Sequence, residues 1–265
     1  MELDVAGATV HAATGGVQFD AARPLIAFVH GAGMDHTVWA LQARYFAHNG
    51  CAVLAVDLPA HGQSQGQALG SVEEMGAWLW TLIEAAGARD ARLVGHSMGA
   101  LAALEAAAAA PERARGLALL GANAAMPVND ELLAATREAP ERAGALIVSW
   151  AYGERSQLGG MRAPGLWMLG GGLSLLARAN GGVLHADFAA CNAYQGGLAA
   201  AARITCPTLV LAGAGDRMTP ARNARALADA IPGAQMAVIE DAGHMMMIEQ
   251  PDRTLDALRA FFAAP

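Results

Sequence analysis

The chain has 265 residues, 54% hydrophobic and 15% charged, a composition that supports a large buried core and excludes a disordered protein. All 17 basic residues are arginine, and the formal net charge of −7 argues against a nucleic-acid-binding surface. The three cysteines, Cys51, Cys191 and Cys206, are widely separated, which argues against a disulfide framework or zinc site and favours a reducing compartment.

The first residues lack the basic and apolar regions of a secretory signal peptide. The longest apolar stretch, residues 165–184, is interrupted by Arg178, Asn180 and several glycines, so it is a poor membrane span. These features predict a cytoplasmic protein without a membrane-spanning segment.

Short apolar runs alternate with helical patterns along the first half of the chain. Residues 2–19 predict an antiparallel hairpin with its turn at Gly15-Gly16. Continuous apolar runs predict strands buried on both faces at 25–29, 51–56, 91–95 and 116–120. Helical periodicity predicts helices at 37–48, 71–87 and 98–109, and Ser71 with Glu74 forms a capping-box pattern at the second of these.

The pattern changes after Gly121. From about 124 to 203 there are only helical segments broken by prolines and glycines, and alternation then resumes with strands 208–212 and 235–239 and helices 220–231 and 251–263. The alternation predicts an α/β fold with a mostly parallel central sheet of about eight strands flanked by helices. The interruption predicts an inserted helical cap over 124–203, between core segments 1–123 and 204–265.

The sequence Gly95-His96-Ser97-Met98-Gly99 lies between the predicted strand 91–95 and the predicted helix 98–109. Gly-x-Ser-x-Gly in a strand–turn–helix context is typical of a nucleophile elbow. The turn is tight, and glycine at positions 95 and 99 leaves room for it. We therefore expect Ser97 to be a catalytic nucleophile, since the alternative, an incidental serine in a Gly-rich turn, leaves the context unexplained.

A serine nucleophile needs a base and a carboxylate that orients the base. Asp216 follows the predicted strand 208–212 and His244 follows the predicted strand 235–239, so both are expected at the carboxyl edge of the sheet with Ser97. Asp57 precedes the serine and is interpreted as a structural turn residue. Asn123 stands where some relatives carry the acid, but an amide cannot serve in that role.

Other candidates for the acid and base are weaker. Glu240 and Asp241 are too close to His244 in sequence to approach its ring, and Asp187 lies in the predicted cap. Three further histidines are interpreted as loop or surface residues, namely His36, His48 and His61. His185, in the predicted cap, is interpreted as a structural residue, the alternative being a contact to substrate.

The negative charge of a tetrahedral intermediate needs backbone N–H donors. The expected donors are Met98, directly after the nucleophile, and Ala32 in the His30-Gly31-Ala32-Gly33 loop. His30 is expected to brace this loop. The predicted substrate pocket comprises His30, Gly31, Met34, Trp150, Trp167 and Met245, and its methionines suit an apolar group of variable shape.

These motifs together resemble the α/β-hydrolase superfamily. The matching residues are 30–33, 57–64, the elbow at 95–99, Gly215-Asp216, and Gly243-His244 followed by Glu249 and Pro251. Serine at 97 differs from the aspartate of epoxide hydrolases and haloalkane dehalogenases, and Ala32 replaces the aromatic residue usual in haloperoxidase-like esterases. The resemblance favours capped carboxylesterases and enol-lactonases, which need no metal or organic cofactor.

We therefore expect a serine hydrolase that cleaves an ester or lactone of a small, largely apolar substrate through an acyl-enzyme on Ser97. No cation is obviously placed for a substrate carboxylate, although Arg217 is a candidate, and this favours neutral esters. The alternatives are a carbon–carbon bond or thioester hydrolase and, from another class, a non-catalytic small-molecule receptor. Carbon–carbon bond hydrolases usually carry Asn and Trp where this chain has His96 and Met245. The sequence leaves a homodimer open.

Overall fold

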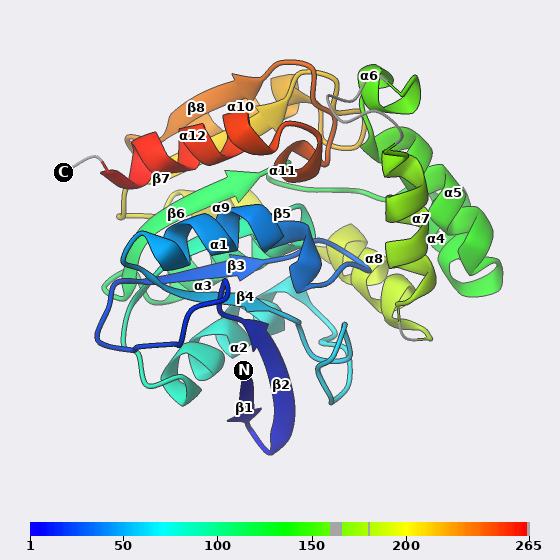
Figure 1. Ribbon diagram of the computed structural model, residues 1–265. Helices are drawn as coiled ribbons and strands as arrows, with labels where there is room; N and C mark the ends of the chain where they lie inside the picture. The colour runs from blue at the N-terminus through cyan, green and yellow to red at the C-terminus, as the bar shows by residue number, and fades with distance from the viewer. Residues whose placement is uncertain (160–165, 180, 264–265) are drawn as a thin grey trace.

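The computed structural model describes residues 1–159, 166–179 and 181–263. A single eight-stranded sheet runs through the molecule in the order β1-β2-β4-β3-β5-β6-β7-β8 (Figure 1). Its strands are β1 (Glu2–Val5), β2 (Ala8–Ala13), β3 (Leu25–Val29), β4 (Ala52–Val56), β5 (Ala91–His96), β6 (Ala114–Leu120), β7 (Thr208–Gly213) and β8 (Gln235–Ile239). This confirms the predicted α/β class and the mostly parallel sheet.

The amino-terminal hairpin is antiparallel, and β2 then joins the sheet antiparallel to β4, while all later pairs are parallel. The hairpin turn was predicted in the wrong place. It lies at Ala6-Gly7, where both residues have positive φ, whereas Gly15 and Gly16 follow β2. The prediction from composition failed because Ala6 tolerates a left-handed conformation that propensity assigns to glycine.

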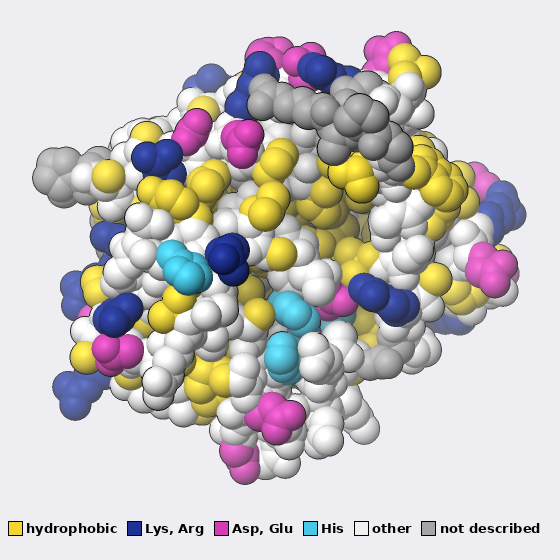
Figure 2. Space-filling view, in the orientation of Figure 1, with side chains coloured by type: hydrophobic (Ala, Val, Ile, Leu, Met, Phe, Trp, Pro, Cys, Tyr) yellow, Lys and Arg dark blue, Asp and Glu magenta, His cyan; other side chains and the backbone are white. Residues whose placement is uncertain are grey.

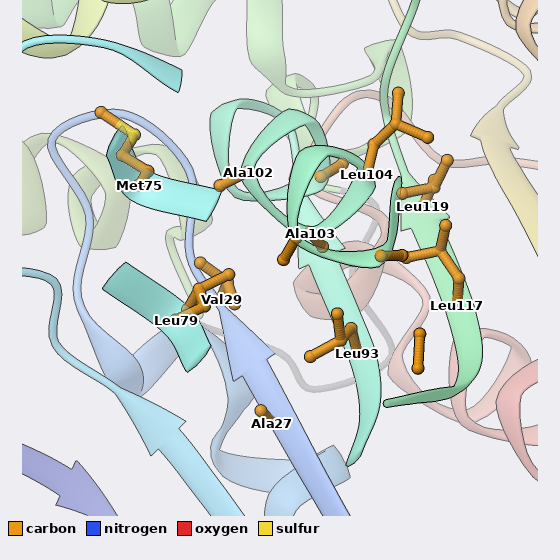
Figure 3. Packing of buried hydrophobic residues seen from close by; sticks show 14 of the residues in the cluster. Ala27, Val29, Met75, Leu79, Leu93, Ala102, Ala103, Leu104, Leu117 and Leu119 are labelled. Atoms are coloured by element: carbon orange, nitrogen blue, oxygen red, sulfur yellow. The ribbon is translucent and has the colours of Figure 1, made fainter. Parts of the chain in front are cut away.

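Both faces of the sheet are covered, as the continuous apolar strands require. In β3, Ile26 and Phe28 face one core cluster and Ala27 and Val29 the other. The first face carries η1 (His36–Trp39), α1 (Ala40–His48) and α12 (Pro251–Ala263), and the second α2 (Val72–Ala85), α3 (Met98–Ala109) and α10 (Ala221–Ala230). In Figure 3 alanines of α3 lie against Leu93 and Val29, so small side chains bring this helix close to the sheet.

Among the described residues, six helices lie between β6 and β7, within the segment predicted as a cap. They are α4 (Asp130–Glu138), α5 (Pro140–Ala151), α6 (Glu154–Gln157), α7 (Met168–Ala177), α8 (Val183–Ala193) and α9 (Gly197–Ala201). Helices α4, α5, α7 and α8 lie beyond the carboxyl ends of the strands (Figure 1), whereas α9 packs against α3 and α10. Residues 160–165 and 180 of the predicted cap lie outside the described residues.

The surface shows where this helical segment meets the core. On the face in Figure 2, hydrophobic side chains gather along that junction, while basic and acidic side chains are scattered around it. Within the described residues, no helix is both long enough and apolar enough to span a membrane.

Candidate active site

Ser97 occupies a strained turn between β5 and α3. Its φ of 54° and ψ of −120° lie in a region that L residues rarely adopt, and such strain persists only where the surrounding structure enforces it. A Cβ at Gly95 would lie 2.2 Å from the Gly99 carbonyl oxygen, and one at Gly99 would lie 2.4 Å from the His30 carbonyl oxygen. Glycine is therefore required on both sides of Ser97, which is the geometry of a nucleophile elbow.

Asp216 and His244 follow β7 and β8 and form a buried hydrogen-bonded pair. His244 Nδ1 lies 2.8 Å from Asp216 Oδ2. Since the carboxylate can only accept, Nδ1 carries the proton and Nε2 is left as the basic nitrogen. Thr219 donates from its hydroxyl to Asp216 Oδ2 at 2.7 Å, and the N–H groups of Met218 and Thr219 donate to Oδ1.

This arrangement keeps Asp216 ionised. Burial alone would raise the pKa of its carboxyl group, but the charge on His244, the hydrogen bond from His244 and those from Thr219 outweigh burial and lower the pKa. A charged, fully bonded carboxylate holds the imidazole in one tautomer and stabilises its protonated form.

A second histidine lies beneath the first. The ring centroids of His96 and His244 are 4.6 Å apart, and His96 Nε2 donates to the His244 carbonyl oxygen at 3.0 Å. Burial, followed by the positive charge of His244, holds the pKa of His96 well below its usual range. His96 is therefore a neutral support for His244 rather than a second base.

The loop after β3 approaches the elbow closely. A Cβ at Gly31 would lie 2.9 Å from His96 Nδ1 and 3.2 Å from Ser97 Cβ. His30 is fully buried, with Nδ1 bonded to the Gly31 carbonyl oxygen and Nε2 accepting from the Leu58 N–H. Burial and then the charge of His61 lower the pKa of His30 to about 3, so His30 braces the loop as a neutral ring.

A buried carboxylate from α8 also holds this loop. Asp187 Oδ2 accepts from the Gly33 N–H at 2.8 Å and lies 2.8 Å from His61 Nε2. Burial would lower the pKa of His61, but its hydrogen bond to Asp187 and the charge of Asp187 raise it. The helical segment is thus tied directly to the loop that carries Ala32.

Ser97, His244 and Thr219 open into one cavity of about 320 Å³ between the core and the helical segment. Its size falls at the lower end for small-molecule sites. The remaining lining residues are Ala32, Asn123, Ala125, Met126, Pro127, Val128, Asn129, Leu132, Trp150, Phe188, Cys191, Arg217, Met218 and Asn223. The wall is apolar on the helical side and polar around Asn123, Arg217 and Asn223.

The predicted pocket residues separate into two groups. Trp150 lines the cavity. His30, Gly31 and Met245 are not among its lining residues, and all three are buried. Met34 and Trp167 line two other surface grooves.

Two interpretations of individual histidines can also be assessed. His185 bonds to Thr136 and Arg137 and is not a cavity residue, which agrees with its structural interpretation. His61 lies in the loop after β4, as predicted, but it is not a surface residue, because it is only 2% exposed and its ring pairs with a carboxylate 126 residues away.

Four supporting residues were not predicted from the sequence. They are Thr219, His96, Asp187 and Glu249. Glu249 accepts from the N–H groups of Gly153 and Gly243 and from the Ser156 hydroxyl, so it fixes the turn before His244. Of these four residues, only Glu249 could be recognised from the sequence, by its place in the motif after His244. The other three act through contacts that sequence spacing does not reveal.

One group of described side chains outside the cavity has metal-ligand chemistry. Donor atoms of His11, His36 and Asp57 lie within 4.8 Å of one another. Asp57 already accepts from the His36 ring, the His36 N–H and the Gln63 N–H, so its carboxylate is fully used in holding its own turn, the structural role predicted for it.

Comparison with known proteins shows the family of the chain. A family described as "Alpha/beta hydrolase family" matches residues 26–257. The chain is 30% identical over 264 residues to a pimeloyl-[acyl-carrier protein] methyl ester esterase of Methylococcus capsulatus, covering 91% of this chain and 95% of that protein. It is 25% identical over 251 residues to an (E)-2-((N-methylformamido)methylene)succinate hydrolase of Acinetobacter baylyi, covering 90% of each.

A solved structure supports the fold. The enol-lactonase from Burkholderia xenovorans superposes with a TM-score of 0.87 at 22% identity, over 100% of both chains. The fold, the strained elbow and the family match define one class: the chain belongs to the alpha/beta hydrolase family, and its relatives include hydrolases of esters and lactones.

Proposed function

We propose that the protein is a serine hydrolase that cleaves a carboxylic ester or lactone through an acyl-enzyme on Ser97. The observation that carries the proposal is the cavity shared by the strained Ser97 and by His244, whose Nδ1 is bonded to the buried Asp216. This leaves His244 Nε2 as the base on the cavity side. The methyl ester esterase named among the relatives supports an ester as the substrate.

In the proposed reaction, Ser97 Oγ attacks the ester carbonyl while His244 Nε2 takes the hydroxyl proton. Asp216 stabilises the imidazolium that forms. The imidazolium then protonates the leaving alcohol oxygen as the C–O bond breaks, and the acyl group stays on Ser97. Water, deprotonated by the same nitrogen, attacks the acyl carbonyl. The bond between the acyl carbon and Ser97 Oγ then breaks, His244 returns the proton to Oγ, and the free acid leaves.

The oxyanion of each tetrahedral intermediate would be held by the backbone N–H groups of Ala32 and Met98. Met98 is the first residue of α3, where N–H groups have no partner inside the helix. Neither N–H donates to another described residue, and Ala32 lines the cavity with Ser97. The bond from Gly33 to Asp187 supports this role because it fixes the loop next to Ala32.

The helical segment would act as the predicted cap and contact the apolar part of a small substrate. Leu132 on α4, Trp150 on α5 and Phe188 on α8 line the cavity opposite the triad. Backbone contact also ties the end of α5 to the base, since the His244 N–H donates to the Ala151 carbonyl oxygen. The three cysteines are free, which is compatible with the reducing cytosol predicted from the sequence.

The proposal is tested with Ser97→Ala and a matched control, Ser174→Ala, whose hydroxyl lies exposed on α7. Hydrolysis of p-nitrophenyl acetate by Ser97→Ala is expected to fall by about 10³-fold or more, because the nucleophile is lost. A fluorophosphonate should label the wild type and Ser174→Ala but not Ser97→Ala. Wild-type rates in Ser97→Ala would reject the proposal. A wild type that neither hydrolyses the ester nor is labelled by the fluorophosphonate would favour a non-catalytic receptor.

A further inference from the structure

One cation faces the cavity without a charged partner. Arg217 follows Asp216 directly, so while the Asp216 carboxylate turns inward to His244, the exposed Arg217 lines the cavity. Among the residues that the structure describes, no carboxylate forms an ion pair with it. By contrast, the side chains of Arg113, Arg115 and Arg142 are each paired with an acid.

The cavity contains nothing that would neutralise this charge. No Asp or Glu occurs among its described lining residues, although the chain has 24 acidic residues and a formal net charge of −7. The Asp216 carboxylate is committed to His244, Thr219 and Met218. A ligand in the cavity therefore meets the guanidinium of Arg217 and no carboxylate among the described lining residues.

A second polar group lies at the same end. Asn123 follows β6, is 8% exposed, lines the cavity, and its Oδ1 has no hydrogen-bond partner among the described residues. A buried acceptor without a partner costs stability. Rotation of this amide by half a turn removes the cost on binding, because its Nδ2 group then donates to a ligand carboxylate. Asn223, on the first turn of α10, adds a further amide to this side.

We propose that Arg217 binds a carboxylate on the substrate, so that the protein is selective for half-esters or lactones of dicarboxylic acids. This inference rests on the proposed serine-hydrolase function and names its substrate class. A guanidinium suits a carboxylate because its planar donors can form two parallel, charge-assisted hydrogen bonds. It replaces the expectation of neutral esters, which depended on finding no cation at the site.

The rest of the cavity fits the other half of such a substrate. Met126, Val128 and Trp150 contribute apolar side chains to the wall of the same cavity. An aliphatic chain along this wall would join the reacting carbonyl at Ser97 to the free carboxylate at Arg217. The substrate class is thus an ester with an apolar middle and an acidic end.

The test compares monomethyl succinate, glutarate, adipate and suberate with the corresponding dimethyl esters, by following proton release in a pH-stat. The wild type should prefer at least one half-ester over its neutral partner in kcat/KM. Arg217→Met should reduce this preference by about 10- to 100-fold, the usual effect of losing a charge-assisted bond, and mainly through KM. High salt should weaken the wild-type preference, because ions screen an exposed arginine.

Arg222→Met is the matched control, since Arg222 is exposed on α10 and does not line the cavity. Both kcat/KM values of Arg222→Met should equal those of the wild type. A wild type with no preference for any half-ester, or an Arg217→Met protein with the same ratio as Arg222→Met, would overturn the proposal.

A binding measurement separates this proposal from the chemistry of Ser97. In calorimetric titrations, Ser97→Ala should bind monomethyl adipate more tightly than dimethyl adipate, and Ser97→Ala with Arg217→Met should lose the difference. Equal affinities in Ser97→Ala would reject the carboxylate site even if ester hydrolysis is established. If Ser97→Ala still binds monomethyl adipate more tightly than dimethyl adipate, but the fluorophosphonate does not label the wild type, the carboxylate site stands and only the serine mechanism is rejected.

Discussion

At the scale of single residues, the proposed active site includes groups that hold His244 in addition to the proposed triad. Thr219 contributes two hydrogen bonds to Asp216, from its backbone and its hydroxyl, and its hydroxyl also lies 3.1 Å from His244 Nδ1. His96 supports the same imidazole from below and bonds to its backbone carbonyl. The orientation of the base is therefore determined from two sides.

Replacement of Thr219 by valine tests this dependence. The substitution keeps the shape of the side chain but removes the donor to Asp216 Oδ2, so we expect kcat to fall by about 10-fold with little change in KM. Thr219→Ser retains the hydroxyl and should recover most of the activity. If serine and valine at this position give the same kcat, the hydroxyl does not position the triad.

At the scale of secondary-structure elements, the helical segment and the core meet through buried polar contacts. Asp187 on α8 accepts from the Gly33 N–H in the loop after β3 and pairs with His61. The end of α5 bonds to the loop of His244 through the Ala151 carbonyl oxygen. Two parts of the catalytic geometry are consequently held by the segment that covers the cavity.

Asp187→Leu is expected to disrupt this contact. It leaves the Gly33 N–H and the His61 ring buried without their acceptor, so the free energy of unfolding should fall by about 3–5 kcal/mol, as for other broken buried pairs. Asp187→Asn keeps an acceptor for Gly33 and should lose less. Urea denaturation measures the free energy of unfolding. The kcat for p-nitrophenyl acetate shows whether the loop after β3, which carries Ala32, keeps its position. Equal stability of leucine and asparagine variants would contradict the proposed contact.

The elements themselves could largely be predicted from the sequence. Continuous apolar runs such as Leu25–Val29 and the glycines around Ser97 are local signals, and each produced the expected element. The residues that tune the site could not be predicted in this way. His61 and Asp187 are 126 residues apart and meet only in the folded chain, and the approach of Arg217 to the cavity depends on how the helical segment closes over it.

At the scale of the whole molecule, buried histidine–carboxylate pairs link stability to pH. The hydrogen bond to Asp57 raises the pKa of His36 despite partial burial, and the bonds from His36 and Gln63 lower the pKa of Asp57 although burial opposes them. The contribution of His36 is complete below its usual value of 6.5 and is lost as pH rises through the raised pKa. That of Asp57 is complete above 3.8 and is lost as pH falls through the lowered pKa.

The pair should therefore stabilise the fold most between pH 3.8 and 6.5 and progressively less on the alkaline side. In His36→Gln the free energy of unfolding, measured in urea at acidic, neutral and alkaline pH, should be lower in that window and should change less than in the wild type as pH rises above 6.5. His48→Gln, at an exposed position, serves as the control. If the free energy of unfolding of His36→Gln varies with pH as it does in the wild type, the His36–Asp57 pair does not make stability depend on pH.

The central claim, that Ser97 forms an acyl-enzyme, is tested most directly by rapid quenching of the reaction with p-nitrophenyl acetate and mass spectrometry of the peptides. The account predicts a burst of nitrophenol and an acetyl group on the peptide that contains Ser97, with neither in Ser97→Ala. Turnover with no acetylated Ser97, or with the acetyl group on another residue that is needed for turnover, would contradict it.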